Sequence, residues 1–146
     1  MSIRKFAIHT VLVLAGLAII LWPRFEKKLD PVKSDSARQA TLRFLHMVDQ
    51  DQFADSWSLS AHLLREKIPQ DKWAGKLKLH RAQCGKFLKR EEKSIDYATE
   101  ASGEQKGEFF TLNFAADYER CPEVTETVTV MLEEDGHWRV GGFFVK

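Results

Sequence analysis

The chain has 146 residues, of which 44% are hydrophobic and 29% are charged, so it has room for one folded domain and little more. Its formal net charge of +1 gives no general attraction to nucleic acid, and we expect no nucleic-acid partner. Four tryptophans and ten phenylalanines can fill a core without a structural metal, and the two cysteines lack the spacing of a zinc site.

An apolar segment at residues 6–22 carries no charge apart from a histidine that can be protonated. As a helix it spans roughly 25 Å, close to the hydrocarbon core of a bilayer at about 30 Å. The sequence therefore predicts a single-pass membrane anchor over residues 1–24, with the bilayer as its partner through residues 6–22. A cleaved signal peptide is disfavoured by the bulky residues 19–22 where small ones are needed. A buried soluble helix is the remaining alternative.

The orientation of this anchor depends on basic residues that lie on both of its sides. Arg4 and Lys5 precede the segment, and residues 24–33 contain four more basic side chains. A literal count of positive charges favours a cytoplasmic domain. A very short basic leader before an apolar run is nevertheless typical of an exported chain. We expect a protein of the inner membrane whose C-terminal domain is extracytoplasmic, in the periplasm.

The helical half follows a linker over residues 25–35, and the domain occupies residues 36–146. Ser36 is the expected N-cap of a helix over residues 37–48, whose apolar residues recur at helical spacing. A short helix is expected at residues 53–57, and Ser60 is expected to cap a further turn or two. A helix over residues 70–82 should then end at Gly85.

The sheet half consists of four expected strands joined in sequence order. Residues 86–99 form a mostly polar strand, residues 109–120 a central one, and residues 124–146 a hairpin. Helices followed by strands indicate an α+β domain, with the helices on one face of a curved antiparallel sheet. We expect the inward face of that sheet to be apolar and sealed, with no carboxylate in a cavity behind it.

The terminal hairpin has a well-defined register. A two-residue period over residues 124–132 predicts a strand with one buried face, and Asp135-Gly136 predicts the turn. A three-residue loop over residues 134–136 pairs Leu132 with Trp138. A two-residue turn would instead set Leu132 opposite Arg139, and apolar and polar side chains would then share one face of the hairpin. We therefore expect the three-residue loop. The exposed face of this hairpin should then contain Thr125, Thr127, Thr129, Phe143 and Val145.

Cys84 and Cys121 fall near the open end of the expected hairpin formed by residues 86–120. At that place their Cα atoms can approach within the 4.4 to 6.8 Å or so of a disulfide, which would form in an oxidising compartment. The alternative is a pair of free buried thiols.

Candidate sites for chemistry are few, and we predict no catalytic, cofactor-binding or metal-binding residue. The acidic pairs at residues 49–51 and 133–135 suit turns and solvated ends, and the five histidines have no metal-site spacing. Arg81, Tyr97 and Tyr118 share inward faces and are expected to line a pocket or to tie helix to sheet. The basic run over residues 72–90 is a solvated face or a site for acidic lipid headgroups.

Several motifs match one known family: A-D-S-W at residues 54–57, G-E-F-F-T-L-N-F at 107–114, E-T-V-T-V at 126–130 and D-G-H-W-R-V-G-G-F-F-V-K at 135–146. The chain from about residue 40 onward resembles the bacterial domain of unknown function 4019 family. The resemblance implies a cystatin-like, nuclear transport factor two-like cone that is commonly exported or attached to a membrane. It implies no activity and no catalytic residues.

Three functions compete at this point. The first is a membrane-anchored, non-enzymatic binding or accessory module of the bacterial envelope. The second is a small-molecule enzyme of the ketosteroid-isomerase or dehydratase kind, which requires a buried acid in a real pocket. The third is a structural partner that associates with another chain, or with itself, through the exposed face of the last hairpin.

Overall fold

The computed structural model describes residues 29–101 and 105–146. Among these residues, no helix is long and apolar enough to cross a membrane. The predicted anchor over residues 6–22 lies outside the described residues.

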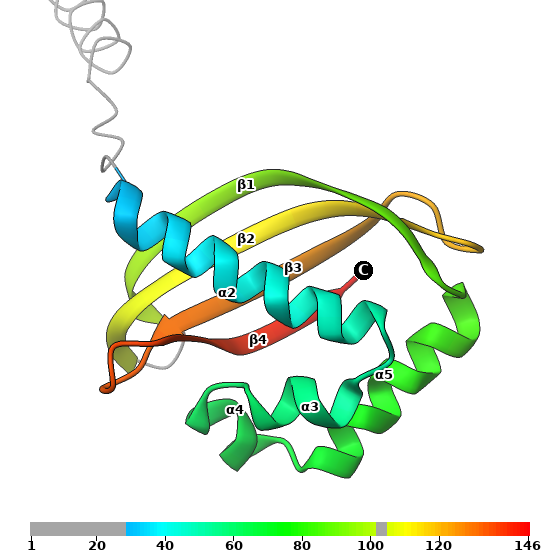
Figure 1. Cartoon of the computed structure of the whole chain (residues 1–146), viewed down its shortest axis with the longest axis horizontal. Helices are drawn as coiled ribbons and strands as arrows, with labels where there is room; N and C mark the ends of the chain where they lie inside the picture. The colour runs from blue at the N-terminus through cyan, green and yellow to red at the C-terminus, as the bar shows by residue number, and fades with distance from the viewer. Residues whose placement is uncertain (1–28, 102–104) are drawn as a thin grey trace, which may run out of the picture.

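Four helices precede a four-stranded antiparallel sheet in which each strand pairs with the next in the chain (Figure 1). Helix α2 crosses one face of the curved sheet, with α3 to α5 beyond it. The predicted α+β architecture, with helices on one face of a four-stranded sheet, is confirmed. The elements are α2 Pro31–Asp49, α3 Phe53–Ser58, α4 His62–Lys67, α5 Gln70–Cys84, β1 Phe87–Ala101, β2 Gln105–Tyr118, β3 Val124–Leu132 and β4 Trp138–Val145.

Helix α2 begins at Pro31, so the predicted N-cap at Ser36 is wrong and residues 31–35 of the expected linker are helical. The cap is Asp30, whose carboxylate accepts hydrogen bonds from the amides of Val32 and Lys33. Proline suits the first helical position because its fixed φ matches a helix and its missing N–H would have no partner there. An Asp-Pro start therefore adds a full turn and more before Ser36.

The two short helices between α2 and α5 lie where they were predicted, but the predicted cap of α4 is wrong. Ser60 does not cap α4, because its hydroxyl donates to the carbonyl of Ser56 at 2.7 Å. The start of α4 is held instead by a backbone bond from Ala61 to the carbonyl of Val140 on β4. Gly85 ends α5 with φ at 80°, as predicted for a glycine stop.

The core lies between α2, α5 and the inward face of the sheet, and aromatic rings dominate it. Phe44 of α2 contacts the rings of Trp73 and Phe143, with centroids 6.0 and 5.4 Å apart. At the other end of the sheet, Phe110 contacts Tyr97 and Trp138. Such ring contacts add about 0.5 to 1.5 kcal/mol each beyond the area that they bury.

The β3–β4 hairpin has the predicted register near its turn, with Leu132 opposite Trp138 and Gly136 at φ 79°. A bulge then shifts the register, because Thr129 and Val130 pair with Gly142 and Val140 and leave Gly141 extra. The shift turns Phe143 inward, where it is 7% exposed, and leaves Phe144 58% exposed. The prediction that Phe143 and Val145 lie on the exposed face is therefore wrong: Val145 is half-buried against the core.

The predicted disulfide between Cys84 and Cys121 is present, with the Cα atoms 5.0 Å apart. It joins the end of α5 to the turn between β2 and β3. The two cysteines pack in a small cluster with Ala116 and Tyr118 of β2.

Candidate functional site

A buried ionic network lies between the sheet and the end of α2, where the sequence led us to expect a sealed apolar wall. Its centre is Glu126 of β3, which is fully buried. Arg90 of β1 donates to both carboxylate oxygens of Glu126 and, at 2.8 and 3.0 Å, to those of Asp49. Tyr118 of β2 donates its hydroxyl to Glu126. The expectation of a wholly apolar inward face is thus wrong, although this carboxylate is paired with Arg90 and Tyr118 and does not line either groove described below.

The ionisation of this network is set by burial and by the pairing of its charges. Burial lowers the pKa of Arg90, but its hydrogen bonds to Glu126 and Asp49 outweigh this effect and raise the pKa above the ordinary value. Burial, followed by the nearby charge of Glu126, raises the pKa of Tyr118. Tyr118 therefore remains a neutral donor, and the guanidinium keeps its charge throughout the physiological range.

The network is suited to holding elements together and poorly suited to acid–base chemistry. A general acid or base must reach a substrate at hydrogen-bond distance. The carboxylates of Glu126 and Asp49 are instead occupied by Arg90 and Tyr118, and neither lines the two grooves described below.

The structure brings two of the three predicted pocket residues into this region. Tyr118 belongs to the network, and Arg81 lies beside it, donating to Asp51 and to the carbonyl of Asp49. Tyr97 lies far along β1, where its hydroxyl donates to Glu108 at 3.1 Å and its ring packs on Phe110. The three therefore do not converge on one space, and Arg81 ties α5 to the end of α2.

His80 of α5 extends the network toward the surface. Its ring meets that of Tyr118 edge to face, with centroids 4.9 Å apart. Its Nε2 atom is buried and has no hydrogen-bond partner among the described residues. Burial lowers the pKa of His80 below the ordinary 6.5, against an upward pull from Glu126 and with a downward contribution from Arg81.

This shift predicts a pH dependence of stability. Below pH 6.5 the unfolded chain protonates His80 more readily than the folded one, so the free energy of unfolding should fall as the pH is lowered from 7 to 5. His80→Phe should reduce this slope, as measured by urea unfolding at several pH values. Equal slopes for wild type and His80→Phe would contradict the assignment.

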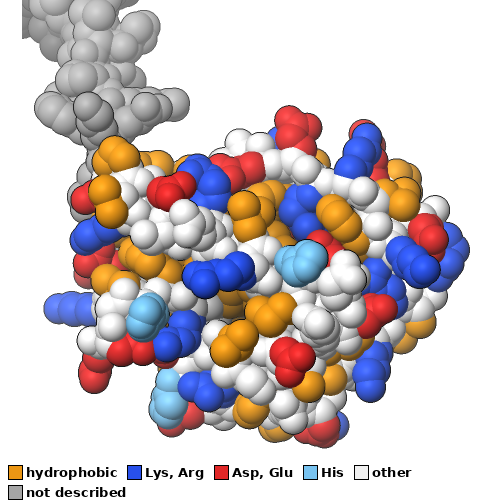
Figure 2. Space-filling view, viewed as in Figure 1, with side chains coloured by type: hydrophobic (Ala, Val, Ile, Leu, Met, Phe, Trp, Pro, Cys, Tyr) orange, Lys and Arg blue, Asp and Glu red, His pale blue; other side chains and the backbone are white. Residues whose placement is uncertain are grey.

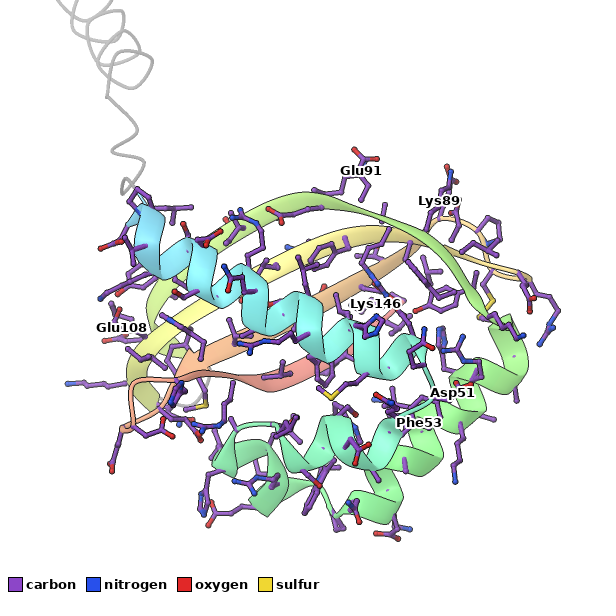
Figure 3. The ribbon with its side chains drawn as sticks, viewed as in Figure 1. Asp51, Phe53, Lys89, Glu91, Glu108 and Lys146 are labelled. Carbon is purple, nitrogen blue, oxygen red and sulfur yellow. A yellow bond between two sulfur atoms is a disulfide. The ribbon has the colours of Figure 1, made fainter. Side chains whose placement is uncertain are left out.

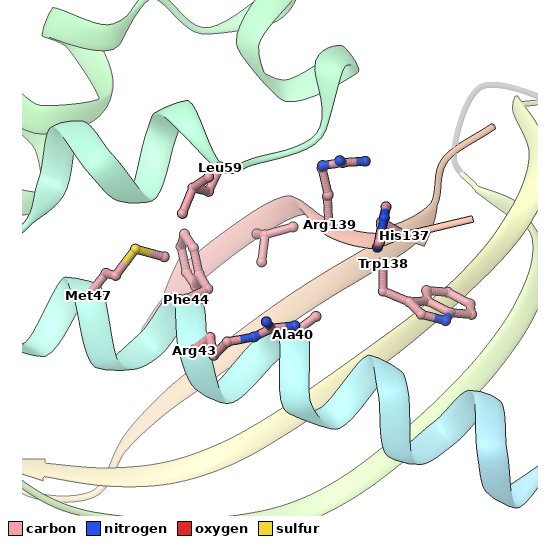
Figure 4. Close-up of a pocket in the computed structure, with 9 residues that line it drawn as sticks. Ala40, Arg43, Phe44, Met47, Leu59, His137, Trp138 and Arg139 are labelled. Atoms are coloured by element: carbon pink, nitrogen blue, oxygen red, sulfur yellow. The ribbon is translucent and has the colours of Figure 1, made fainter. Parts of the chain in front are cut away.

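One surface groove lies between α2, the segment after α3 and the start of β4 (Figure 4). It has a volume of about 200 Å³. Its floor is apolar, with the buried ring of Phe44 below and Leu59, 63% exposed, on the rim. Figure 2 shows hydrophobic and basic side chains interspersed on the face where α2 crosses the sheet. The lining is Ala40, Arg43, Phe44, Met47, Leu59, His137, Trp138, Arg139 and Val140.

The ionisable side chains that line this groove are all basic, and its two arginines differ in whether they have a partner. Arg139 donates to Glu133 at 2.6 Å and to Asp135 at 2.7 and 2.9 Å. Its guanidinium, followed by the backbone amide of His137, lowers the pKa of Asp135 to about 2. Arg43, across the groove on α2, has no ion-pair or hydrogen-bond partner among the described residues. The groove thus combines an apolar floor with one uncommitted positive charge.

Sequence reasoning missed Glu126 and Arg43 as residues of interest, and it placed Arg90 only in the basic run over residues 72–90. The sequence contained a sign of Glu126, because this charged residue occupies an inward position in the alternation of β3. An unpaired carboxylate at such a position would be costly, so a buried partner could have been expected. Its partner Arg90 could not be chosen from the many basic residues nearby. Arg43 carries no signal in the sequence, since its importance depends on the loop that brings Leu59 across α2.

The family model described as protein of unknown function (DUF4019) matches residues 40–143, well over half of the chain. The chain belongs to this family. The resemblance noted from the motifs is thereby confirmed. DUF4019 spans the groove residues from Ala40 to Val140 and the whole of the Arg90 network, while Phe144 to Lys146 lie beyond the match. No curated protein matches the chain.

Proposed function

We propose that the protein is a membrane-anchored, non-enzymatic binding module of the bacterial envelope, and that its groove takes a small apolar molecule bearing an anionic group. The observation that carries this proposal is the apolar groove beside Arg43, a guanidinium without a partner among the described residues. A charge-assisted hydrogen bond to such a group contributes about 1.5 to 3 kcal/mol. The floor formed by Phe44 and Trp138 supplies the apolar contact.

The location that we propose is the outer side of the inner membrane. It is supported by the uncharged segment at residues 6–22, which is long enough to anchor a chain. It is also supported by the disulfide between Cys84 and Cys121, because such bonds persist in oxidising compartments and are rare in the cytosol.

The enzymatic alternative has one observation in its favour, the buried carboxylate of Glu126. An isomerase of the ketosteroid type needs such a group facing its substrate. Glu126 instead bonds to Arg90 and Tyr118, and it is not among the residues that line the groove. The binding module is therefore the better supported function.

The proposal is tested with octanoate, which carries a carboxylate on an apolar chain, and with octanamide, its neutral counterpart. The full chain in nanodiscs is titrated by calorimetry, and a titration of empty nanodiscs is subtracted. Octanoate should bind with one site per chain, and Arg43→Glu should weaken it by about ten- to a hundredfold, because a charge-assisted bond is replaced by repulsion.

Two controls make this result specific. Lys78→Glu makes the same change of net charge at an exposed position of α5 outside the groove, and it should leave the affinity within about twofold of wild type. Octanamide should bind wild type and Arg43→Glu equally. An octanoate affinity that is insensitive to Arg43→Glu, or no octanoate binding above the empty-disc reference, would refute the proposal.

A further inference from the structure

The outer edge of β4 presents backbone groups that have no partner within the described part of the chain. Thr125 of β3 and Lys146 exchange both of their backbone hydrogen bonds, which fixes the alternation of this ladder. The backbone N–H and C=O groups of Phe144 therefore point toward β3. The backbone N–H and C=O groups of Phe143 and Val145 point away from the sheet. Neither residue has a backbone partner on that side among the described residues.

This edge differs from the opposite one. Strand β1 carries many charges of both signs, and its register shifts at three places, both of which protect an edge from pairing. Figure 3 shows Lys89 and Glu91 of β1 directed away from the body of the domain. Strand β4 reads W-R-V-G-G-F-F-V and has one charge in eight residues. Its first half is covered where Ala61 bonds to Val140, but the end at Phe143–Val145 is not.

A second groove, of about 210 Å³, runs between the end of β4 and α5. Its lining is Trp73, Lys76, Leu77, Leu79, His80, Gln83, Phe143 and Val145, so it contains no acidic residue. Lys76 lies 5.9 Å from the ring centre of Phe144 and has no ion pair among the described residues. The edge therefore offers strand pairing, an apolar recess for a side chain, and a positive charge beside it.

We propose that β4 binds an extended, acidic polypeptide segment of a partner protein, which adds to the sheet as a fifth strand along Phe143–Val145. When a peptide adds to a sheet edge, the backbone hydrogen bonds supply affinity. The groove supplies specificity, because it receives every second side chain of the added strand. Apolar residues of the segment face the groove, and an acidic residue meets Lys76. Charge complementarity favours this occupant over a second copy of the chain, whose own Lys76 and Lys146 would approach the same edge and repel.

The test uses the peptide Ac-E-T-V-T-V-T-E-NH2 on the full chain in nanodiscs, with amide hydrogen exchange as the readout. The amides of Phe143 and Val145 should exchange at least tenfold more slowly with saturating peptide, and that of Phe144, already bonded to β3, should be unchanged. A peptide N-methylated at both valines keeps every side chain and loses the donors that pair with β4. It should give no protection.

The charge component is tested on the protein. Lys76→Glu should weaken the affinity for the peptide about tenfold. Lys78→Glu, at an exposed position of the same helix outside the groove, should leave that affinity within about twofold of wild type. Absence of protection at Phe143 and Val145, or equal binding of the N-methylated peptide, would overturn the proposal. Concentration-dependent protection without peptide would also overturn it, in favour of a second copy as the occupant.

Discussion

Replacing Arg90 with alanine is expected to lower the free energy of unfolding by about 3 to 5 kcal/mol. The change leaves Glu126, which is fully buried, without a counter-charge, and removing one partner of a buried ion pair has this magnitude of effect. Asp49 loses its two bonds from Arg90 at the same time. Urea unfolding followed by circular dichroism measures the difference.

Two further variants distinguish the cost of leaving a buried charge unpaired from the cost of losing a single ion-pair contact. Arg38→Ala breaks the partly exposed pair with Glu92 and should cost no more than about 1 kcal/mol. The double variant Arg90→Met with Glu126→Met removes the fully buried carboxylate together with its counter-charge, and it should cost less than the sum of the single changes because Glu126 is no longer left unpaired, although Asp49 still loses its partner. A cost for Arg90→Ala below that of Arg38→Ala would contradict the role assigned to the network.

Replacing both Cys84 and Cys121 with alanine is expected to lower the free energy of unfolding by about 3 to 4 kcal/mol. The two cysteines are 37 residues apart in sequence, and closing a loop of that size restricts the unfolded chain by about this amount in the chain-entropy model. Urea unfolding of the oxidised wild type and of the double variant gives the comparison.

The reduced wild type provides the control for this prediction. It should unfold within about 1 kcal/mol of the double variant, since both lack the cross-link and differ in two sulfur atoms. A double variant as stable as the oxidised wild type would show that the bond does not constrain the unfolded chain.

Near its turn, the last hairpin could be predicted from local rules. The alternation of β3, the glycine at position 136 and the need to keep Leu132 and Trp138 on one face admit one register. Beyond Val130 the prediction failed, because a bulge depends on how the strand meets α2 and α5. The two adjacent glycines at 141 and 142 were the sole local sign of it.

The helical half shows a similar division. The inward stripe of α2 and the stop at Gly85 follow from spacing and backbone freedom. The start of α2 was missed because charged residues and a proline suggested a tether, whereas Asp30 and Pro31 form a helix start. The grooves could not be predicted, since each is made by segments distant in sequence, such as Leu59 with His137 or Leu79 with Val145.

The bulge at Gly141 has a consequence for how the chain tolerates changes of length. Its extra residue reverses the alternation, so Trp138, Val140 and Phe143 all face the core although their spacing is two and then three. Removing that one residue would return β4 to a strict two-residue period. Phe143 would then lie two residues after Val140 and would still face the core, so deleting this one glycine would keep the sidedness of the last residues of the sheet. Deleting both Gly141 and Gly142 would instead bring Phe144 to the core side in place of Phe143.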